Sequence, residues 1–283
     1  MKRCIWLLPV AGFLFGCGPD RDEIISSDGV ATVHMYASIE VVSSVDKHVY
    51  GNAQFTLSGP PSESKSQDEY IEFSKSERLW LSGSGNLRDK ELGEDIFSGL
   101  ESLASDFKVF EGKVSKTLLP FLFLFTHSVP HQIRYHSQTE IEDGASEITV
   151  SLLRENNLDA LNSVVTLPDS FEIEYTSAVE KPSRKQDDIE ITWDTTEADV
   201  RVELEVLVSC GTDDEEHDFL KQYASDTGLA RIPAGWLHDR DLKGECNTTI
   251  NVHRIRTGSL DSAYLGGVIT GSRVRSMTLV TTE

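Results

Sequence analysis

The stretch VRVELEVLV, residues 200–208, decides the fold of this 283-residue chain. Apolar side chains occupy every second position from Val200 to Val208, which is the period of a β-strand with one buried face. Alternating segments of the same kind lie at residues 171–175, 189–193, 246–256 and 271–280. Short alternating strands separated by turns predict a β-sandwich in the second half of the chain.

This order of strands resembles that of immunoglobulin-like and fibronectin type III-like domains. In such domains a tryptophan closes an alternating strand, and Trp193 occupies that place here, after an entry through Leu167-Pro168. The antibody-type disulfide between the two central strands is not part of this pattern. The resemblance covers residues 167–283 and implies a sandwich there.

The first residues of the chain predict an export signal. Lys2 and Arg3 precede an apolar run over residues 5–15, and Gly16 is followed by Cys17. The run is too short to span a membrane as a helix. It resembles a bacterial lipoprotein signal, in which cleavage after the small residue makes Cys17 the acylated first residue of the mature protein.

The resemblance to lipoproteins also implies a cellular location. It implies attachment of the protein to a membrane through acyl chains such as palmitate on Cys17. Residue 18 is glycine and not the aspartate associated with inner-membrane retention, so the resemblance implies the outer membrane, with the periplasmic and surface sides both open. The whole arrangement is similar to uncharacterised bacterial lipoproteins with an immunoglobulin-like C-terminal domain, on the segments VTLP (165–168), DTG (226–228) and the turn at 254–260. Such proteins bring no assigned activity with them.

Beyond Cys17 the chain has 266 residues (283 minus 17), which fits two domains of ordinary size. Residues 18–29 are polar and bracketed by glycine, and we expect a flexible tether that reaches roughly 40 Å when fully stretched. We predict an N-terminal β-sandwich over residues 30–166 and the immunoglobulin-like sandwich over residues 167–283. The predicted fold class is all-β.

Two cysteines remain for the folded body. By these expectations Cys4 would leave with the signal and Cys17 would carry lipid, so Cys210 and Cys246 remain as an even pair in an oxidising compartment. We expect a disulfide between them, with α-carbons roughly 4.4 to 6.8 Å apart. A loop of that length closed by a disulfide stabilises a protein by roughly 4 kcal/mol in the chain-entropy model.

The first half is a series of shorter strand candidates. Residues 31–42 place Val33, Met35, Ala37, Ile39 and Val41 on one face. Further strands are expected at residues 50–57, 70–73, 79–81, 132–138, 147–154 and 163–166.

Two segments of the first half do not follow this pattern of short strands. After Asp95, apolar residues fall at helical spacing and predict a short amphipathic helix: Ile96, Phe97, Leu100, Leu103, Ala104 and Phe107. Residues 118–125 are apolar at every position. We favour a strand covered on both faces, with this helix on one side; the alternative is an exposed contact surface for a lipid, ligand or partner.

The net charge argues against anionic partners. The chain has 26 basic and 47 acidic residues for a net charge of -21, which becomes -23 when Lys2 and Arg3 leave with the signal. Such a surface repels nucleic acid and anionic lipid headgroups.

Three patterns invite a chemical interpretation. Asp226-Thr227-Gly228 matches the aspartic-protease triplet, but the chain has no second copy, so we favour a turn into a strand at residues 229–232. His127, His131 and His136 lie close in sequence, but Pro130 disrupts helical ligand spacing, so surface or edge histidines are favoured over a metal site. The acidic run at residues 213–218 lacks the glycine and spacing of a calcium loop, and we expect a solvated loop.

We therefore assign no catalytic residue, no metal ligand and no cofactor from the sequence. Two classes of function stay open. The first is a non-enzymatic, lipid-anchored envelope protein whose sandwich loops or edges contact an envelope protein or a glycan. The second is an anchored hydrolase or metal-dependent enzyme whose site is assembled only by folding. We favour the first, and converging titratable groups in the folded protein would favour the second.

Overall fold

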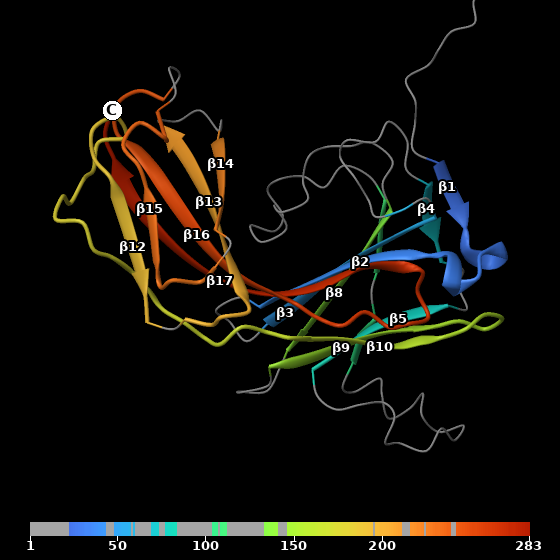
Figure 1. The fold of residues 1–283 in the computed structure, drawn as a ribbon. Helices are drawn as coiled ribbons and strands as arrows, with labels where there is room; N and C mark the ends of the chain where they lie inside the picture. The colour runs from blue at the N-terminus through green and yellow to red at the C-terminus, as the bar shows by residue number, and fades with distance from the viewer. Residues whose placement is uncertain are drawn as a thin grey trace, which may run out of the picture.

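The computed structural model describes residues 23–43, 48–57, 59, 69–73, 77–83, 104–106, 108–111, 133–140, 146–194, 196–210, 216–223, 225–238 and 242–283. In these ranges the chain forms β-strands and two single-turn 3-10 helices, η1 (Ser27–Gly29) and η2 (Thr32–His34) (Figure 1). No helix in the described ranges is long and apolar enough to cross a membrane.

The strands follow one another along the whole chain. Those before residue 167 are β1 (Glu23–Ser26), β2 (Tyr36–Ser43), β3 (His48–Thr56), β4 (Glu69–Glu72), β5 (Arg78–Ser82), β6 (Ala104–Asp106), β7 (Lys108–Glu111), β8 (Ile133–Glu140), β9 (Glu147–Leu153) and β10 (Ala160–Thr166). Those after it are β11 (Ile173–Tyr175), β12 (Ile189–Trp193), β13 (Val200–Cys210), β14 (Glu216–Tyr223), β15 (Leu229–Ile232), β16 (Cys246–Thr257) and β17 (Gly266–Thr281).

The described strands form three sheets. The largest has the order β1-β4-β3-β2-β17-β16-β13-β14, with β8 paired to β3 and β7 paired to β8. A second sheet has the order β10-β9-β5-β6, and a third has the order β11-β12-β15. Each smaller sheet lies over one part of the largest sheet, so the molecule has two β-sandwiches (Figure 1).

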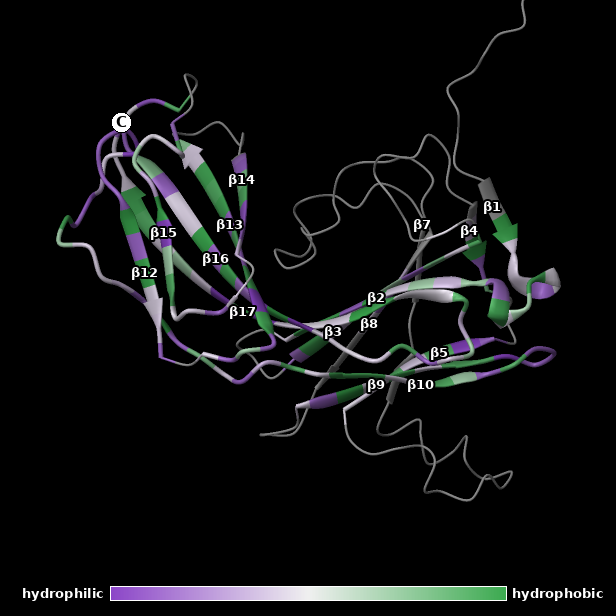
Figure 2. Cartoon of the chain, viewed as in Figure 1, coloured by the Kyte–Doolittle hydropathy of each residue, from purple (hydrophilic) through white to green (hydrophobic). Residues whose placement is uncertain are grey.

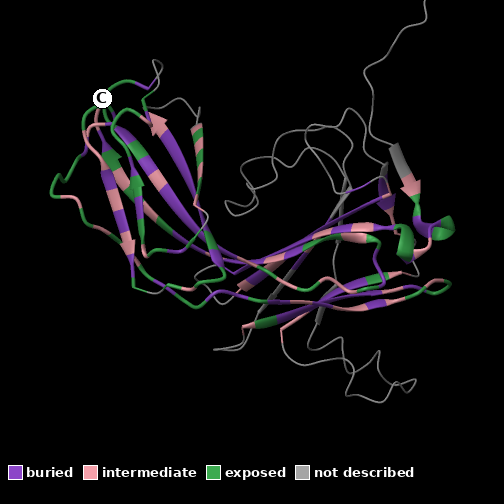
Figure 3. Cartoon of the chain, viewed as in Figure 1, coloured by how far each residue is buried: buried purple, intermediate pink, exposed green. Residues whose placement is uncertain are grey.

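Each sandwich has its own apolar core. In the first sandwich, Ile39 and Phe55 of the large sheet pack with Leu81 and Leu152 of the second sheet. In the second sandwich, the inward side chains of β13 and β16 pack with β12 and β15 of the third sheet. Figure 2 shows hydrophobic and hydrophilic residues alternating along β12 and β13. Burial alternates along β12, whereas β13 is buried at every position from 202 to 208 (Figure 3). The predicted all-β, sandwich class of fold is confirmed.

Strand β17 joins the two sandwiches. Its first part, Gly266 to Arg273, pairs in parallel with β2, and its longer part from Thr270 to Thr281 pairs with β16. Gly267 allows β17 to approach β2 closely. It has a φ of 123°, and a β-carbon there would lie 1.9 Å from the carbonyl oxygen of Ala37. The end of the chain therefore completes the first sandwich as well as the second.

The core of the first sandwich includes residues from both sides of the predicted boundary at residue 166. Ala263, Tyr264 and Ile269 belong to the core of the first sandwich, although they lie far beyond that position in sequence. They reach it because β17 starts beside β2. As a boundary between domains, residue 166 stays a prediction.

Three predictions in the first half need correction. Residues 23–29, assigned to the tether, form β1 and η1, because β1 pairs with β4. The strand expected from residue 31 starts at Tyr36, since residues 32–34 form η2 and leave Val33 exposed. Residues 104–106, assigned to the end of the helix, form β6 through pairing with β5.

Other predictions for the first half are not tested. The remainder of the expected helix, residues 95–103 with Phe107, lies outside the described residues, and so does the apolar run at 118–125. Cys17 and the predicted export signal lie outside them too.

Candidate functional site

Four arginines line one face of β16 and β17 where the two sandwiches meet. Arg254 and Arg256 alternate on β16, and Arg273 and Arg275 alternate on β17. Arg254 pairs directly with Arg273 in the antiparallel register, so all four side chains share one face of the sheet. We call these four residues the arginine ladder.

The arginine ladder binds the segment that connects the sandwiches, residues 167–170. Each arginine donates to a successive residue of this connector: Arg256 Nη1 to the carbonyl oxygen of Leu167 (3.2 Å), Arg273 Nε to that of Pro168 (2.5 Å), Arg254 Nη1 to that of Asp169 (2.9 Å) and Arg275 Nη2 to Ser170 Oγ (3.0 Å). The connector is therefore fixed against the large sheet.

Gly271 makes room for this contact. It pairs with Arg256 across the sheet, and a β-carbon at this position would lie 2.8 Å from Cγ2 of Val165 and 3.2 Å from Cδ2 of Leu167. A side chain here would push the connector away from the arginine ladder.

Carboxylates balance the buried positive charge. The guanidinium of Arg254, which is fully buried, lies 2.6 Å from Asp226 Oδ2 and 2.8 Å from Glu197 Oε2. Arg256 binds the other oxygen of Glu197 and also Asp199, at 2.9 Å. Buried charges persist in proteins when they are paired and hydrogen-bonded in this way.

Ionisation at the arginine ladder reflects both burial and pairing. Burial lowers the pKa of Arg273, and the nearby positive charge of Arg275 lowers it further. Burial also acts to lower the pKa of Arg256, but hydrogen bonds to Asp199 and Glu197 raise it above its ordinary value. The hydrogen bond from Arg256 in turn lowers the pKa of Asp199.

An aromatic side chain completes the junction. The ring of Phe171 lies between two arginines, with Arg254 Cζ 5.1 Å and Arg275 Cζ 5.6 Å from its centroid. The ring of Trp193 stands edge-on to it at 6.5 Å. Guanidinium groups are attracted to the faces of aromatic rings, so Phe171 binds the connector to the arginine ladder through its side chain.

The Asp226-Thr227-Gly228 triplet belongs to this junction. Asp226 is buried, and its carboxylate accepts from Trp193 Nε1 (2.7 Å) and Arg254 Nε (2.8 Å). Gly228 follows with a φ of 72° and leads into β15, so the interpretation as a turn before a strand is confirmed. A protease aspartate shares a proton with a second aspartate, whereas Asp226 is paired with a guanidinium.

A second polar cluster lies on the opposite face of the large sheet. His253 and Glu205 are both buried, with Nε2 3.7 Å from Oε2. Asn251 donates to the same carboxylate (2.7 Å) and accepts from Ser276 (2.6 Å). Neither ring nitrogen of His253 makes a hydrogen bond within the described part of the chain. An imidazole beside a carboxylate is an acid–base pair, but no group of three His, Cys, Asp or Glu side chains in the described ranges could hold a metal ion.

The candidate histidines and the acidic run do not come together. His136 lies on β8, where its Nδ1 is 2.5 Å from Asn52 Oδ1, whereas His127 and His131 lie outside the described residues. Residues 216–218 of the acidic run open strand β14 through pairing with β13, so a loop was the wrong prediction for them. The rest of that run, residues 213–215, is not described.

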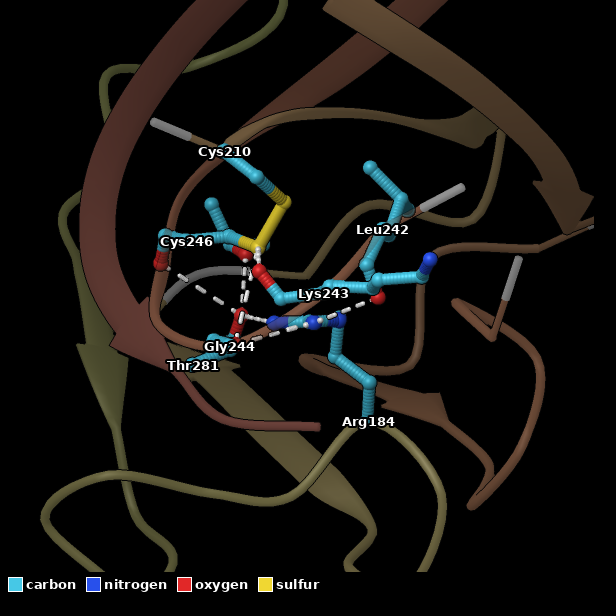
Figure 4. The surroundings of a disulfide bond; sticks show 8 residues. Arg184, Cys210, Leu242, Lys243, Gly244, Cys246 and Thr281 are labelled. Atoms are coloured by element: carbon cyan, nitrogen blue, oxygen red, sulfur yellow. Dashed lines mark hydrogen bonds between the residues drawn. A yellow bond between two sulfur atoms is a disulfide. The ribbon is translucent and has the colours of Figure 1, made fainter. Parts of the chain in front are cut away.

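The predicted disulfide is present. Cys210 and Cys246 are directly opposite each other on β13 and β16, and their α-carbons lie 4.2 Å apart, slightly closer than expected. Figure 4 shows Arg184 beside this bond. The buried guanidinium of Arg184 donates to Thr281 Oγ1 (2.9 Å) and to the carbonyl oxygen of Gly244 (3.1 Å), and burial lowers its pKa. Arg184 thereby fixes the turn before Cys246 to the end of β17.

Comparisons with known proteins add little to this description. No protein-family model matches the chain, and no curated protein matches it. Among solved structures, the chain is similar to the crystal structure of chicken CNTN1 FN1-FN3 domains, with 10% sequence identity over 93% of this chain and 69% of that chain and a TM-score of 0.23. A similarity this low carries no argument, so the fold class depends on the sheets and cores themselves.

Proposed function

We propose that the chain is a lipid-anchored, non-enzymatic module of the bacterial cell envelope that holds two β-sandwiches as one rigid body and presents their loops to a protein or glycan. In this proposal the second sandwich is of the immunoglobulin or fibronectin type III kind. The observation that carries the proposal is the junction, where the arginine ladder fixes the connector and β17 belongs to both sandwiches.

The junction supports a structural role because bending there would be costly. Any hinge motion at residues 167–170 would break hydrogen bonds from all four members of the arginine ladder. It would also separate the buried guanidinium of Arg254 from the carbonyl oxygen of Asp169, and a buried donor left without its acceptor is unfavourable. A rigid body of two sandwiches presents loops at fixed positions, which suits a binding or structural module.

The chemistry of the junction agrees with a non-enzymatic role. Asp226 and Glu197 face guanidinium groups and are fully engaged in ion pairs. Such carboxylates hold structure together and are poorly placed to move protons. The proposed anchor is Cys17, which follows a short apolar run and a small residue.

Two measurements test the proposal. Membrane fractions of cells should retain the protein, because several acyl chains together give stable anchoring. Cys17→Ser removes the proposed acylation site and should release the protein. Spin labels on the exposed residues Glu147 and Glu180, one in each sandwich, should give a single narrow distance distribution. Unchanged fractionation of Cys17→Ser would contradict the anchor, and a broad distance distribution would contradict the rigid body.

A further inference from the structure

Three exposed apolar side chains gather at one end of the first sandwich. Val33, on η2, is 44% exposed; Leu158, in the loop between β9 and β10, is 60% exposed; and Leu265, in the turn before β17, is 54% exposed. We call these three residues the apolar tip. Single exposed apolar residues are ordinary, but a cluster from three separate segments marks an interaction surface.

Backbone contacts bring the three segments of the apolar tip together. Thr32 Oγ1 donates to the carbonyl oxygen of Leu158 (2.5 Å), which places the β9–β10 loop beside η2. The amide of Leu265 donates to the carbonyl oxygen of Met35 (2.9 Å), which places the turn before β17 on the other end of η2. Val33 lies in the chain between these two contacts.

A buried arginine makes the apolar tip a preformed surface. Arg154 donates to the carbonyl oxygens of Ser27 (2.8 Å) and Val30 (2.6 Å), and its Nε lies 2.5 Å from Glu77 Oε1. These contacts hold the segment from η1 to η2 against the sandwich. The apolar side chains are therefore presented at a fixed place.

The position of the apolar tip in the chain indicates what covers it. Strand β1 starts at Glu23, and η1 and η2 follow it directly, beside the point where the chain enters the sandwich (Figure 1). Five residues, 18–22, separate Glu23 from Cys17, and the six α-carbon steps span at most roughly 20 Å. If Cys17 carries the lipid anchor, this end of the first sandwich lies against the membrane surface.

We infer that the apolar tip lies on the lipid bilayer, with Val33, Leu158 and Leu265 in the headgroup region, and this inference rests on the proposed lipid anchor. The lipid surface that fits is zwitterionic. Asp28 and Glu155 are exposed in the same segments, and the chain carries a net charge of -21, so anionic headgroups are repelled. The second sandwich, at the other end of the molecule from β1, then points away from the membrane (Figure 1).

The experiment couples the full mature chain through the thiol of Cys17 to maleimide lipid in phosphatidylcholine vesicles, so that it does not depend on acylation in the cell. Leu158→Trp adds a fluorescent reporter to the apolar tip, and Leu220→Trp, at a residue of β14 that is 53% exposed, is the matched control. Brominated phosphatidylcholine quenches tryptophan that contacts lipid. We expect it to quench the added fluorescence of Leu158→Trp by about twofold or more and that of Leu220→Trp hardly at all.

A further variant sharpens the test. Adding Val33→Asp and Leu265→Asp to Leu158→Trp should abolish the quenching, because two carboxylates would have to enter the headgroup region. Equal quenching of the Leu158→Trp and Leu220→Trp reporters, or none at Leu158→Trp, would overturn the inference. Because the coupling is chemical, failure of the cellular anchor would appear only in the fractionation of Cys17→Ser, and the two failures are separable.

Discussion

Arg154 of the first sandwich and Arg254 of the second both have fully buried side chains, but they bind different partners. Arg154 of the first sandwich pairs with one carboxylate, that of Glu77, and otherwise donates to backbone carbonyls of the entering chain. Arg254 of the second sandwich pairs with two carboxylates, those of Asp226 and Glu197, and also binds the connector between the sandwiches. One arginine therefore organises a local segment, and the other joins two halves of the molecule.

The difference shows how sequence distance changes the role of the same chemical group. The carbonyl acceptors of Arg154 lie in a short N-terminal segment, so losing them would loosen one end of one sandwich. The acceptors of Arg254 come from the connector and from the loops after β12 and before β15, so they depend on the second sandwich being assembled. Buried ion pairs of this kind contribute more to a unique arrangement than to net stability, which we state as a hypothesis for this chain.

Arg254→Met should have the largest effect and should reach both sandwiches. It leaves Asp226 and Glu197 without their shared cation, which costs about 3 to 5 kcal/mol when a buried pair loses one partner. 5-Fluorotryptophan signals of Trp80 on β5 and Trp193 on β12 would report the two sandwiches separately during urea unfolding. We expect the Trp193 transition to move to lower urea, together with a broader distance distribution between spin labels on the two sandwiches.

Arg154→Met is the matched variant for this comparison. It should lower the urea midpoint reported by Trp80 and leave the spin-label distribution narrow, because Arg154 does not touch the connector. If both variants broadened the distribution to the same extent, it would be wrong that Arg254 holds the two sandwiches together and Arg154 does not.

Removal of the disulfide should have the next largest effect and should be confined to the second sandwich. Cys210→Ala with Cys246→Ala releases a loop with a sequence separation of 36 residues, which costs up to roughly 4 kcal/mol in the chain-entropy model. The Trp193 signal should unfold at lower urea while the Trp80 signal keeps its midpoint. A matching shift of Trp80 would mean that the shared strand β17 transmits the loss to the first sandwich.

The sequence predicts the second sandwich better than its junction. Strict alternation located β12, β13 and β16, and cysteine counting located the disulfide, since both are local properties of the chain. Arg254 and Arg256 are alternate residues of a strand and look like an ordinary polar face. Their binding to the connector depends on the register of β16 with β17, which the sequence does not reveal.

Two strands show why tertiary contacts limit such predictions. Strand β14 begins in an acidic run that favours a loop by composition, and its pairing with β13 outweighs that preference. The sequence predicts the final strand from residue 271, whereas β17 starts at Gly266 and pairs with β2 from there. Two glycines of this strand allow close approach: a β-carbon at Gly267 would collide with Ala37, and one at Gly271 would collide with Val165. The apolar tip gave no signal either, because its three residues are separated by more than a hundred positions.

Alkaline pH should lower the stability of the first sandwich, by less than the loss of Arg254 or of the disulfide lowers that of the second. Burial raises the pKa of Tyr264 well above its ordinary value of 10.0, with a further rise from nearby Asp261. Burial also raises the pKa of Tyr135, whose hydroxyl donates to the carbonyl oxygen of Ile71 (3.1 Å).

A raised pKa in the folded state means that the stabilisation is fully present below pH 10 and is lost as the pH rises toward the folded-state value. Each tyrosine should therefore cost about 1 kcal/mol of unfolding free energy between pH 10 and pH 11, where the tyrosine of the unfolded chain passes from half to almost fully ionised. Urea unfolding followed at Trp80 should show this loss, and Tyr264→Phe should reduce it by about half, whereas the control Tyr223→Phe in the second sandwich should leave it unchanged. An equal alkaline loss in Tyr264→Phe and in the unaltered protein would show that the buried tyrosines do not set the pH dependence of the first sandwich.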